Sequence, residues 1–294
     1  MTRKRRGFTL PEVIVSLVIA GIIGGAFMRL LMNQNRYFSH ESNLRNARSI
    51  ARSASNIVLA DLRMVQDSGG VDSVAASGKL VRILVPYRFG LVCGTNSNTT
   101  IVSMLPIDSG MMAVSVYKGF AFRDSTTGNY TYVSPSNPTG SDIPVASATP
   151  AQCTGSAAGQ AQIRTVSVNG RTGDILDLKS NGASGAPQNS AVFLWQKITY
   201  SFRASQAYPG RMGLWRNVDG GRNEEIMSPF DTSAGFRFYK AGKDVPEAAP
   251  PAKELVRGID LVLTAVSPRA VANDSTPSQS RVVTSVFFKN VRAF

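Results

Sequence analysis

The chain has one histidine, two cysteines and few acidic residues, and these shortages limit its chemistry. Its 294 residues contain 19 Asp and Glu against 32 Lys and Arg, for a formal charge of +13. The single histidine, His40, lies in HESNL, which lacks the second histidine of a zinc-protease helix, so we expect a solvated helix residue. G-x-S-x-G, P-loop and G-x-G-x-x-G signatures are also missing. We therefore expect no enzyme, and no catalytic, cofactor or metal site.

Two weaker candidates for a site are present. Asp219, Glu224 and Glu225 lie near a Gly-Gly pair, but their spacing matches no calcium loop, and we expect a solvated turn. Aromatic residues alternate with arginine at 87–89 and 236–239, as on a base-stacking surface, but half-buried strands alternate in the same way. The positive charge is spread along the chain, so nucleic-acid binding is an alternative that no local basic cluster supports.

One apolar run is long enough to cross a membrane. Residues 8–28 would span a hydrocarbon core of about 30 Å as a helix. The basic residues at 3–6 precede it and would stay in the cytoplasm, and no A-x-A cleavage site follows it. Glu12 stands at the mouth of this run. Because an acidic side chain in lipid costs about 2.5 to 3.5 kcal/mol, Glu12 should have a partner.

The sequence RKRRGFTLPEVIVSLVIAGII resembles the prepilin N-terminus of type IV pilins and type II secretion pseudopilins. The resemblance implies that a prepilin peptidase cuts after Gly7 on the cytoplasmic side and that Phe8 becomes the N-methylated first residue. Glu12 is then the fifth mature residue. In that family its carboxylate meets the N-terminal amine of a neighbouring subunit, so that two charges, each costly alone in lipid, neutralise each other.

Beyond the apolar run the pattern predicts a stalk helix and a β-rich head. An apolar stripe with helical spacing continues the helix to about Gln66, a length of roughly 90 Å; it consists of Leu44, Ala47, Ala51, Ala54, Val58, Leu62 and Val65. Ten runs rich in Val, Ile, Phe and Tyr follow, without long helical patterns between them: 79–89, 99–105, 111–122, 162–168, 174–178, 191–204, 211–217, 235–241, 258–267 and 281–289.

These patterns predict an α+β fold in which the long N-terminal helix packs on an antiparallel sheet. We divide the chain into a leader (1–7), a transmembrane helix half (8–28), an amphipathic stalk helix (29–68) and an extracytoplasmic head (69–294). Composition predicts loops at 124–162, 180–190, 241–254 and 267–280. The first is long enough to be disordered, to be functional or to contain short strands.

Cys93 and Cys153 both follow the apolar run, so the positive-inside orientation places them outside the cytoplasm. They are candidates for a disulfide there, and two buried thiols are the alternative.

The C-terminal half resembles minor pilins of the PilW and PulJ (GspJ-like) type. The similar segments are ITYSFRASQAYPGRMGLWRN and a closing V-x-x-x-F-x-x-N-x-R strand. We expect the residues that carry this resemblance to be architectural, stabilising the fold rather than taking part in chemistry: Tyr200, Leu214, Trp215, Arg216, Phe288, Asn290 and Arg292. Residues 86–190 resemble no family.

The two resemblances imply a minor pilin, anchored once in the bacterial inner membrane, that primes or caps a type IV pilus. The head would lie in the periplasm or on the surface filament. Its partners would be the prepilin peptidase, other minor and major pilins, and the inner-membrane assembly platform. The alternatives are a minor pseudopilin of a type II secretion system and, in another class, a tip module that binds DNA or a surface.

Overall fold

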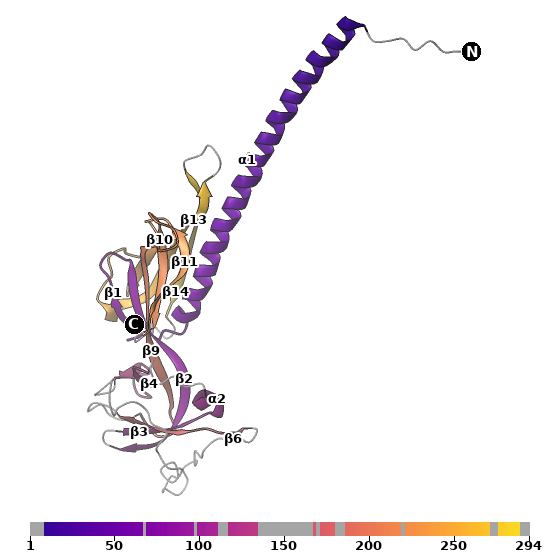
Figure 1. The fold of residues 1–294 in the computed structure, drawn as a ribbon. Coiled ribbons are helices and arrows are strands. Elements are labelled where there is room, and N and C mark those ends of the chain that lie inside the picture. Colours follow the sequence, from indigo (N-terminus) through magenta and orange to yellow (C-terminus); the bar gives the residue numbers. More distant parts are fainter. Residues whose placement is uncertain are drawn as a thin grey trace.

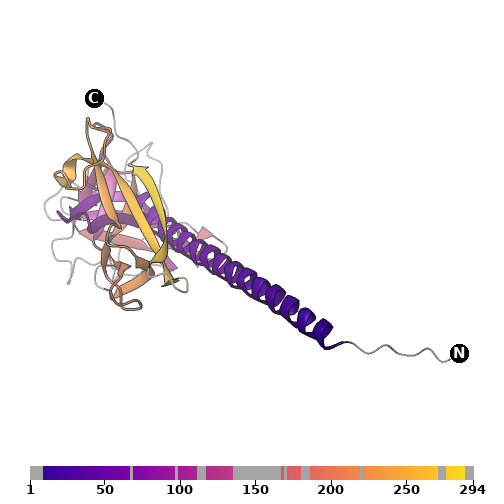
Figure 2. The same cartoon turned by 90° about the horizontal axis from the view of Figure 1, so that it is seen from above.

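The computed structural model describes residues 9–66, 69–96, 99–110, 117–134, 167–168, 171–179, 186–218, 221–270 and 276–288. One long helix, α1 (Leu10–Leu62), projects from an antiparallel β head, and only its C-terminal part lies against the strands (Figures 1 and 2). The predicted α+β class, with a long N-terminal helix packed on an antiparallel sheet, is confirmed.

The predicted apolar stripe of α1 is its buried face. Ala47, Ala51, Ala54, Val58 and Leu62 are buried against the sheet. The helix ends at Leu62, four residues earlier than the sequence pattern predicted. After it the backbone N–H of Val65 donates to the Leu62 carbonyl at 3.2 Å, in a tight turn that places the Val65 side chain in the core. At about 1.5 Å per residue the 53 residues of α1 are roughly 80 Å long.

The head contains fourteen described strands and two short helices. The strands are β1 (Val71–Val74), β2 (Leu80–Asn96), β3 (Thr99–Met104), β4 (Gly119–Arg123), β5 (Tyr130–Val133), β6 (Ser167–Val168), β7 (Arg171–Thr172), β8 (Ile175–Lys179), β9 (Ala191–Ala204), β10 (Met212–Val218), β11 (Asn223–Phe230), β12 (Gly235–Lys240), β13 (Val256–Ala270) and β14 (Pro277–Phe287). The short helices are α2 (Pro106–Gly110) and the 3-10 turn η3 (Lys253–Leu255).

Twelve of the strands form one sheet, whose main order is β12-β13-β11-β10-β9-β2-β3-β8. At its sides β1 pairs with β2, β14 with β13, and β4 with β9 and β5. β6 and β7 pair only with each other among the described strands. The two longest central strands, β2 and β9, pair from Leu80 opposite Ser201 to Leu91 opposite Ala191.

Two hydrophobic cores lie along these two strands. The helix-side core contains the stripe of α1 together with Tyr200, Phe202, Phe236, Leu261 and other apolar residues of the sheet. The distal core lies at the other end of β2 and β9 and includes Val102, Phe120, Leu176, Leu178 and Leu194. The segment that resembled no family, 86–190, therefore contributes most of the distal core.

The structure corrects several boundaries. The predicted loop at 267–280 is wrong over most of its length, because β13 continues to Ala270 and β14 begins at Pro277. The long loop predicted at 124–162 contains β5, and its part from 135 onward lies outside the described residues. β1, β7 and β11 were not predicted. The loop at 241–254 is confirmed, with one bridge between Phe238 and Glu247.

Candidate functional site

The N-terminal part of α1 makes no contact with the head that would bury it. All residues from 9 to 38 are exposed, and they include long apolar side chains such as Leu17 and Ile22. Within the described residues, α1 is the one helix that is long and apolar enough to cross a membrane. So much apolar surface on one segment is unfavourable in water, so it requires lipid or neighbouring helices around it.

Glu12 lies in the first turn of this exposed segment. Pro11 precedes it, and the backbone N–H groups of Glu12 and Val13 both donate to the Thr9 carbonyl, at 3.0 and 3.2 Å. The one serine of the apolar run, Ser16, donates its hydroxyl to the Glu12 carbonyl at 2.8 Å, so that hydroxyl needs no partner outside the helix. Among the described residues the Glu12 carboxylate has no salt bridge. It is therefore available to a second molecule.

Three glycines in the same segment leave space beside the helix backbone. An added Cβ at Gly21, Gly24 or Gly25 would meet nothing within 4 Å, so these positions are open on the isolated chain. Small residues let a neighbouring helix approach closely in lipid. Gly7 and Phe8 lie outside the described residues, so leader cleavage and N-methylation at this junction remain predictions.

A polar cluster joins the C-terminal end of α1 to the sheet. The Tyr200 hydroxyl on β9 donates to Asp61 Oδ2 at 2.6 Å, and Arg216 Nη2 on β10 lies 3.4 Å from the same oxygen. Arg216 Nε also donates to the Tyr200 hydroxyl at 3.3 Å. The three groups form a closed network at the edge of the helix-side core, and this network ties the C-terminal end of α1 to β9 and β10.

Two groups of the network, the Tyr200 hydroxyl and the Arg216 guanidinium, hold their protons more tightly than usual. Burial raises the pKa of Tyr200, and the charge and hydrogen bond of Asp61 raise it further. Burial alone would lower the pKa of Arg216, but its interactions with Tyr200 and Asp61 outweigh burial and raise that pKa. Over the physiological pH range the phenol therefore keeps its proton and the guanidinium keeps its charge.

The architectural role expected for the C-terminal motif residues is confirmed where they are described. Tyr200, Leu214, Trp215 and Phe288 are buried, and Asn290 and Arg292 lie outside the described residues. Sequence reasoning missed Asp61. The signal was an acidic residue beside the apolar stripe in the last turn of a helix, where a negative charge opposes the helix dipole and so needs a specific partner.

Cys93 and the lone histidine lie in different parts of the described structure, one on β2 and the other on α1. Cys93 is buried on β2 and Cys153 lies outside the described residues, so their pairing stays a prediction. His40 is an exposed residue of α1, as expected. No group of three or more His, Cys, Asp and Glu suited to a metal ion occurs in the described part of the chain.

The solvated turn expected near the Gly-Gly pair is wrong for two residues of the acidic group, which lie on a strand, although Glu224 is exposed. Glu224 and Glu225 are residues of strand β11, and Asp219 lies outside the described residues. The Glu225 carboxylate accepts hydrogen bonds from the Ser205 hydroxyl and from the backbone N–H of Gln206, at 2.5 and 2.8 Å. These bonds lower its pKa against the effect of burial. Its role is to hold the turn that follows β9.

The aromatic and arginine alternation belongs to half-buried strands. Phe236 and Phe238 are buried in the helix-side core, and Arg237 between them is exposed. At the other segment, Arg88 lies 5.6 Å from the centre of the Tyr87 ring, and Phe89 packs edge to face on Phe193. The four rings therefore have packing partners within the protein, and they form no row of free faces for bases.

Comparison with known families gives one match, at the N-terminus. Residues 2–28 match the family model for the prokaryotic N-terminal methylation motif. Comparisons with curated proteins and with solved structures give no significant match. The match covers the exposed apolar segment and Glu12, so the chain contains a prepilin-type N-terminus of the type IV pilin and pseudopilin kind.

Proposed function

We propose that this protein is a minor pilin of the PilW and PulJ type, a structural subunit that primes or caps assembly of a type IV pilus. The observation that carries the proposal is that the described part of the methylation motif, 9–28, is exposed at every residue and continues into α1. The rest of α1 is fixed to a large head. The arrangement supports a subunit that offers its N-terminal helix to neighbours and its head to the filament surface.

The assembly step follows from the charge on Glu12. A prepilin peptidase would remove residues 1–7 and leave a methylated amine on Phe8 at the start of the helix. In the inner membrane this cation and the Glu12 carboxylate are both costly without a partner. Packing of one subunit against another places the amine of one beside the carboxylate of the other, and the three glycines allow the helices to approach. Neutralisation thus favours the assembled state.

The test compares Glu12→Ala and Glu12→Gln with Glu41→Gln, which removes a glutamate from the same helix outside the apolar run. We expect the Glu12 variants to be processed and membrane-inserted but to recover at least about tenfold less partner pilin in pull-downs. The reason is that breaking a desolvated charge pair costs about 2 kcal/mol or more. Undiminished recovery with both Glu12 variants would show that charge pairing is not the basis of assembly.

The kind of filament is a separate question, answered by counting surface pili in cells that lack the gene. Loss of pili would support the pilus assignment, and normal pili with defective protein export would favour the minor pseudopilin. The proposed role is structural and needs no catalytic site. We place the head in the periplasm or on the filament, with the assembly platform and other pilins as partners.

A further inference from the structure

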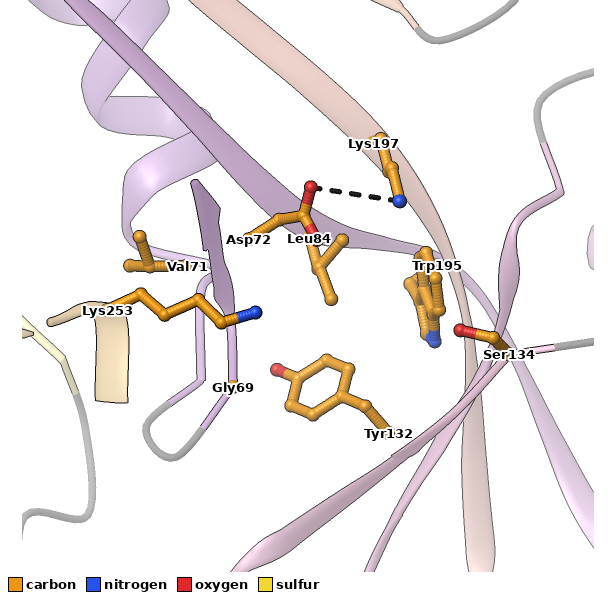
Figure 3. A pocket seen from close by; sticks show the side chains of 9 residues that line it. All are labelled: Gly69, Val71, Asp72, Leu84, Tyr132, Ser134, Trp195, Lys197 and Lys253. Atoms are coloured by element: carbon orange, nitrogen blue, oxygen red, sulfur yellow. Dashed lines mark ion pairs between the residues drawn. The ribbon is translucent and has the colours of Figure 1, made fainter. Parts of the chain in front are cut away.

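A pocket of about 460 Å³ lies between the helix-side and distal parts of the head, where the chain leaves α1 and reaches β1 (Figure 3). Its wall is built from five separate segments of the chain, and it is lined by Gly69, Val71, Asp72, Leu84, Tyr132, Ser134, Trp195, Lys197 and Lys253. Its volume falls in the range of sites that hold small organic molecules. The Glu12 surface lies at the far end of α1 and shares no residue with it.

One side of the pocket is aromatic and apolar. The rings of Tyr132 and Trp195 pack edge to face, with centres 6.3 Å apart. Gly69 makes room for the Tyr132 ring: its φ is +141°, and an added Cβ would stand 2.8 Å from Tyr132 Cδ2. Val71 and Leu84 complete the apolar wall. A ligand in contact with these groups needs a carbon skeleton.

Trp195 also leaves a donor without an acceptor. Its side chain is 2% exposed, and its Nε1–H has no hydrogen-bond partner among the described residues. In Figure 3 the indole nitrogen is turned toward the side of the pocket where Tyr132 and Ser134 lie. A buried donor without a partner costs about 1 to 3 kcal/mol. Because the nitrogen atom itself is buried, Trp195 offers the pocket its ring rather than its N–H.

The charges around the pocket are unbalanced. Lys197 Nζ and Arg82 Nη1 each lie 3.7 Å from Asp72 Oδ2, so the one lining carboxylate is already shared by two cations. The Lys253 amine points into the pocket beside the Tyr132 hydroxyl (Figure 3), and it has no salt bridge within the described chain. Among the described side chains, three cations and one anion lie at the pocket, a positive balance that suits an anion.

We propose that this pocket binds a small organic carboxylate. The carboxylate pairs with the Lys253 amine, and the carbon skeleton lies against Tyr132, the Trp195 ring and Leu84. One unpaired lysine beside an apolar wall fits a singly charged organic acid better than inorganic phosphate, which would leave that wall without contacts. The site adds a ligand-binding function to the head, beyond the proposed role in assembly.

The test uses the full chain in detergent with Trp215→Phe as background, which leaves Trp195 as its only tryptophan. The probes are glucuronate, N-acetylalanine and benzoate, with glucose as the neutral counterpart of glucuronate and inorganic phosphate as the second anion. We expect at least one carboxylate to change the Trp195 fluorescence saturably below about 10 mM. Lys253→Met should raise its dissociation constant at least tenfold, and Lys253→Arg should largely preserve binding.

The matched control is Lys243→Met, since Lys243 lies in the same segment but pairs with Glu247 outside the pocket. It should leave the affinity unchanged. The proposal is overturned if none of the three carboxylates saturates, if glucose binds as well as glucuronate, or if phosphate alone binds. It is equally overturned if Lys253→Met, folded by circular dichroism, binds like the background protein.

Discussion

Asp61 shows how a single side chain can connect the end of a long helix to two strands. It lies in the last turn of α1 and holds the Tyr200 hydroxyl and the Arg216 guanidinium at once. The sequence predicted that Tyr200 and Arg216 were architectural, but it could not predict their shared partner, because 139 residues separate Asp61 from Tyr200. Only the pairing of β9 with β10, which places Arg216 opposite Tyr200, brings the three groups together.

Replacing Asp61 with alanine removes the acceptor of a hydroxyl that belongs to a fully buried tyrosine. We expect Asp61→Ala to lower the free energy of unfolding of the head by about 1 to 3 kcal/mol, the range for a buried group left without its partner. Chemical denaturation of the protein in detergent measures the change. The exposed Asp244→Ala serves as the control, and an equal effect of both variants would contradict the role of the network.

Tyr87 gives a pH-dependent prediction. Burial raises its pKa to about 12, and the nearby Arg88 charge only partly opposes this. Above pH 10 the unfolded chain loses the Tyr87 proton while the folded chain keeps it until about pH 12, so stability should fall as the pH rises through this interval. Because the buried hydroxyl has no partner among the described residues, Tyr87→Phe should preserve stability at pH 7.

Tyr87→Phe should also reduce the loss of stability at alkaline pH. Tyr37→Phe, on the exposed part of α1, should leave that loss unchanged. Unfolding curves at pH 7, 10 and 11 distinguish these outcomes. Part of the loss will persist in Tyr87→Phe, because the pKa of Tyr200 is raised as well. Equal slopes of stability against pH in Tyr87→Phe and the unchanged protein would rule out the assignment to Tyr87.

At the scale of elements, α1 is held by small side chains. Alanines on its buried face let the helix approach β13 and β14 closely, with little volume to spare. Ala54→Leu adds three carbon atoms to a fully buried position, and we expect it to lower the free energy of unfolding by about 1 to 3 kcal/mol. Ala60→Leu makes the same change on the exposed face and should be nearly neutral. Equal effects in denaturant titrations would show that the stripe is not tightly packed.

The elements that sequence reasoning missed share a physical cause. The 3.6-residue spacing and the apolar runs predicted α1 and most strands, since their side chains alone determine which face is buried. β11 reads NEEIMSPF and looks polar because Glu224 is exposed and Glu225 holds the turn after β9. The end of β13 and the start of β14 look like a loop, but the Ser267 hydroxyl donates to the Arg269 carbonyl and accepts from the Ser278 N–H, across a bulge.

At the scale of the whole molecule, α1 and the head are independent along most of the helix. The pocket could not be predicted at all, since five segments contribute to it and none has a recognisable motif. The exposed apolar segment of α1 with Glu12 could be predicted, because the residues that define it are consecutive in the sequence. A site formed by consecutive residues can be predicted from the sequence, whereas a site formed by distant segments that the fold brings together cannot.

Removal of residues 1–33 tests this independence. We expect the shortened chain to remain soluble without detergent and to keep the free energy of unfolding of the head within about 0.5 kcal/mol, because the described part of the deleted segment, 9–33, is exposed throughout. Circular dichroism during denaturation provides the comparison with the full chain. A large loss of stability would mean that the exposed segment supports the head.

The position of β13 and β14 against α1 has a consequence for how the protein is made. The helix is synthesised first, but the strands that cover its alanine stripe end at Ala270 and Phe287, near the end of the chain. β2 likewise has no partner strand β9 until about a hundred further residues have been synthesised. A nascent chain therefore holds an uncovered helix until β13 and β14, about two hundred residues later, leave the ribosome. Folding begins late, and during that wait the growing polypeptide depends on a membrane or a chaperone to protect its first element.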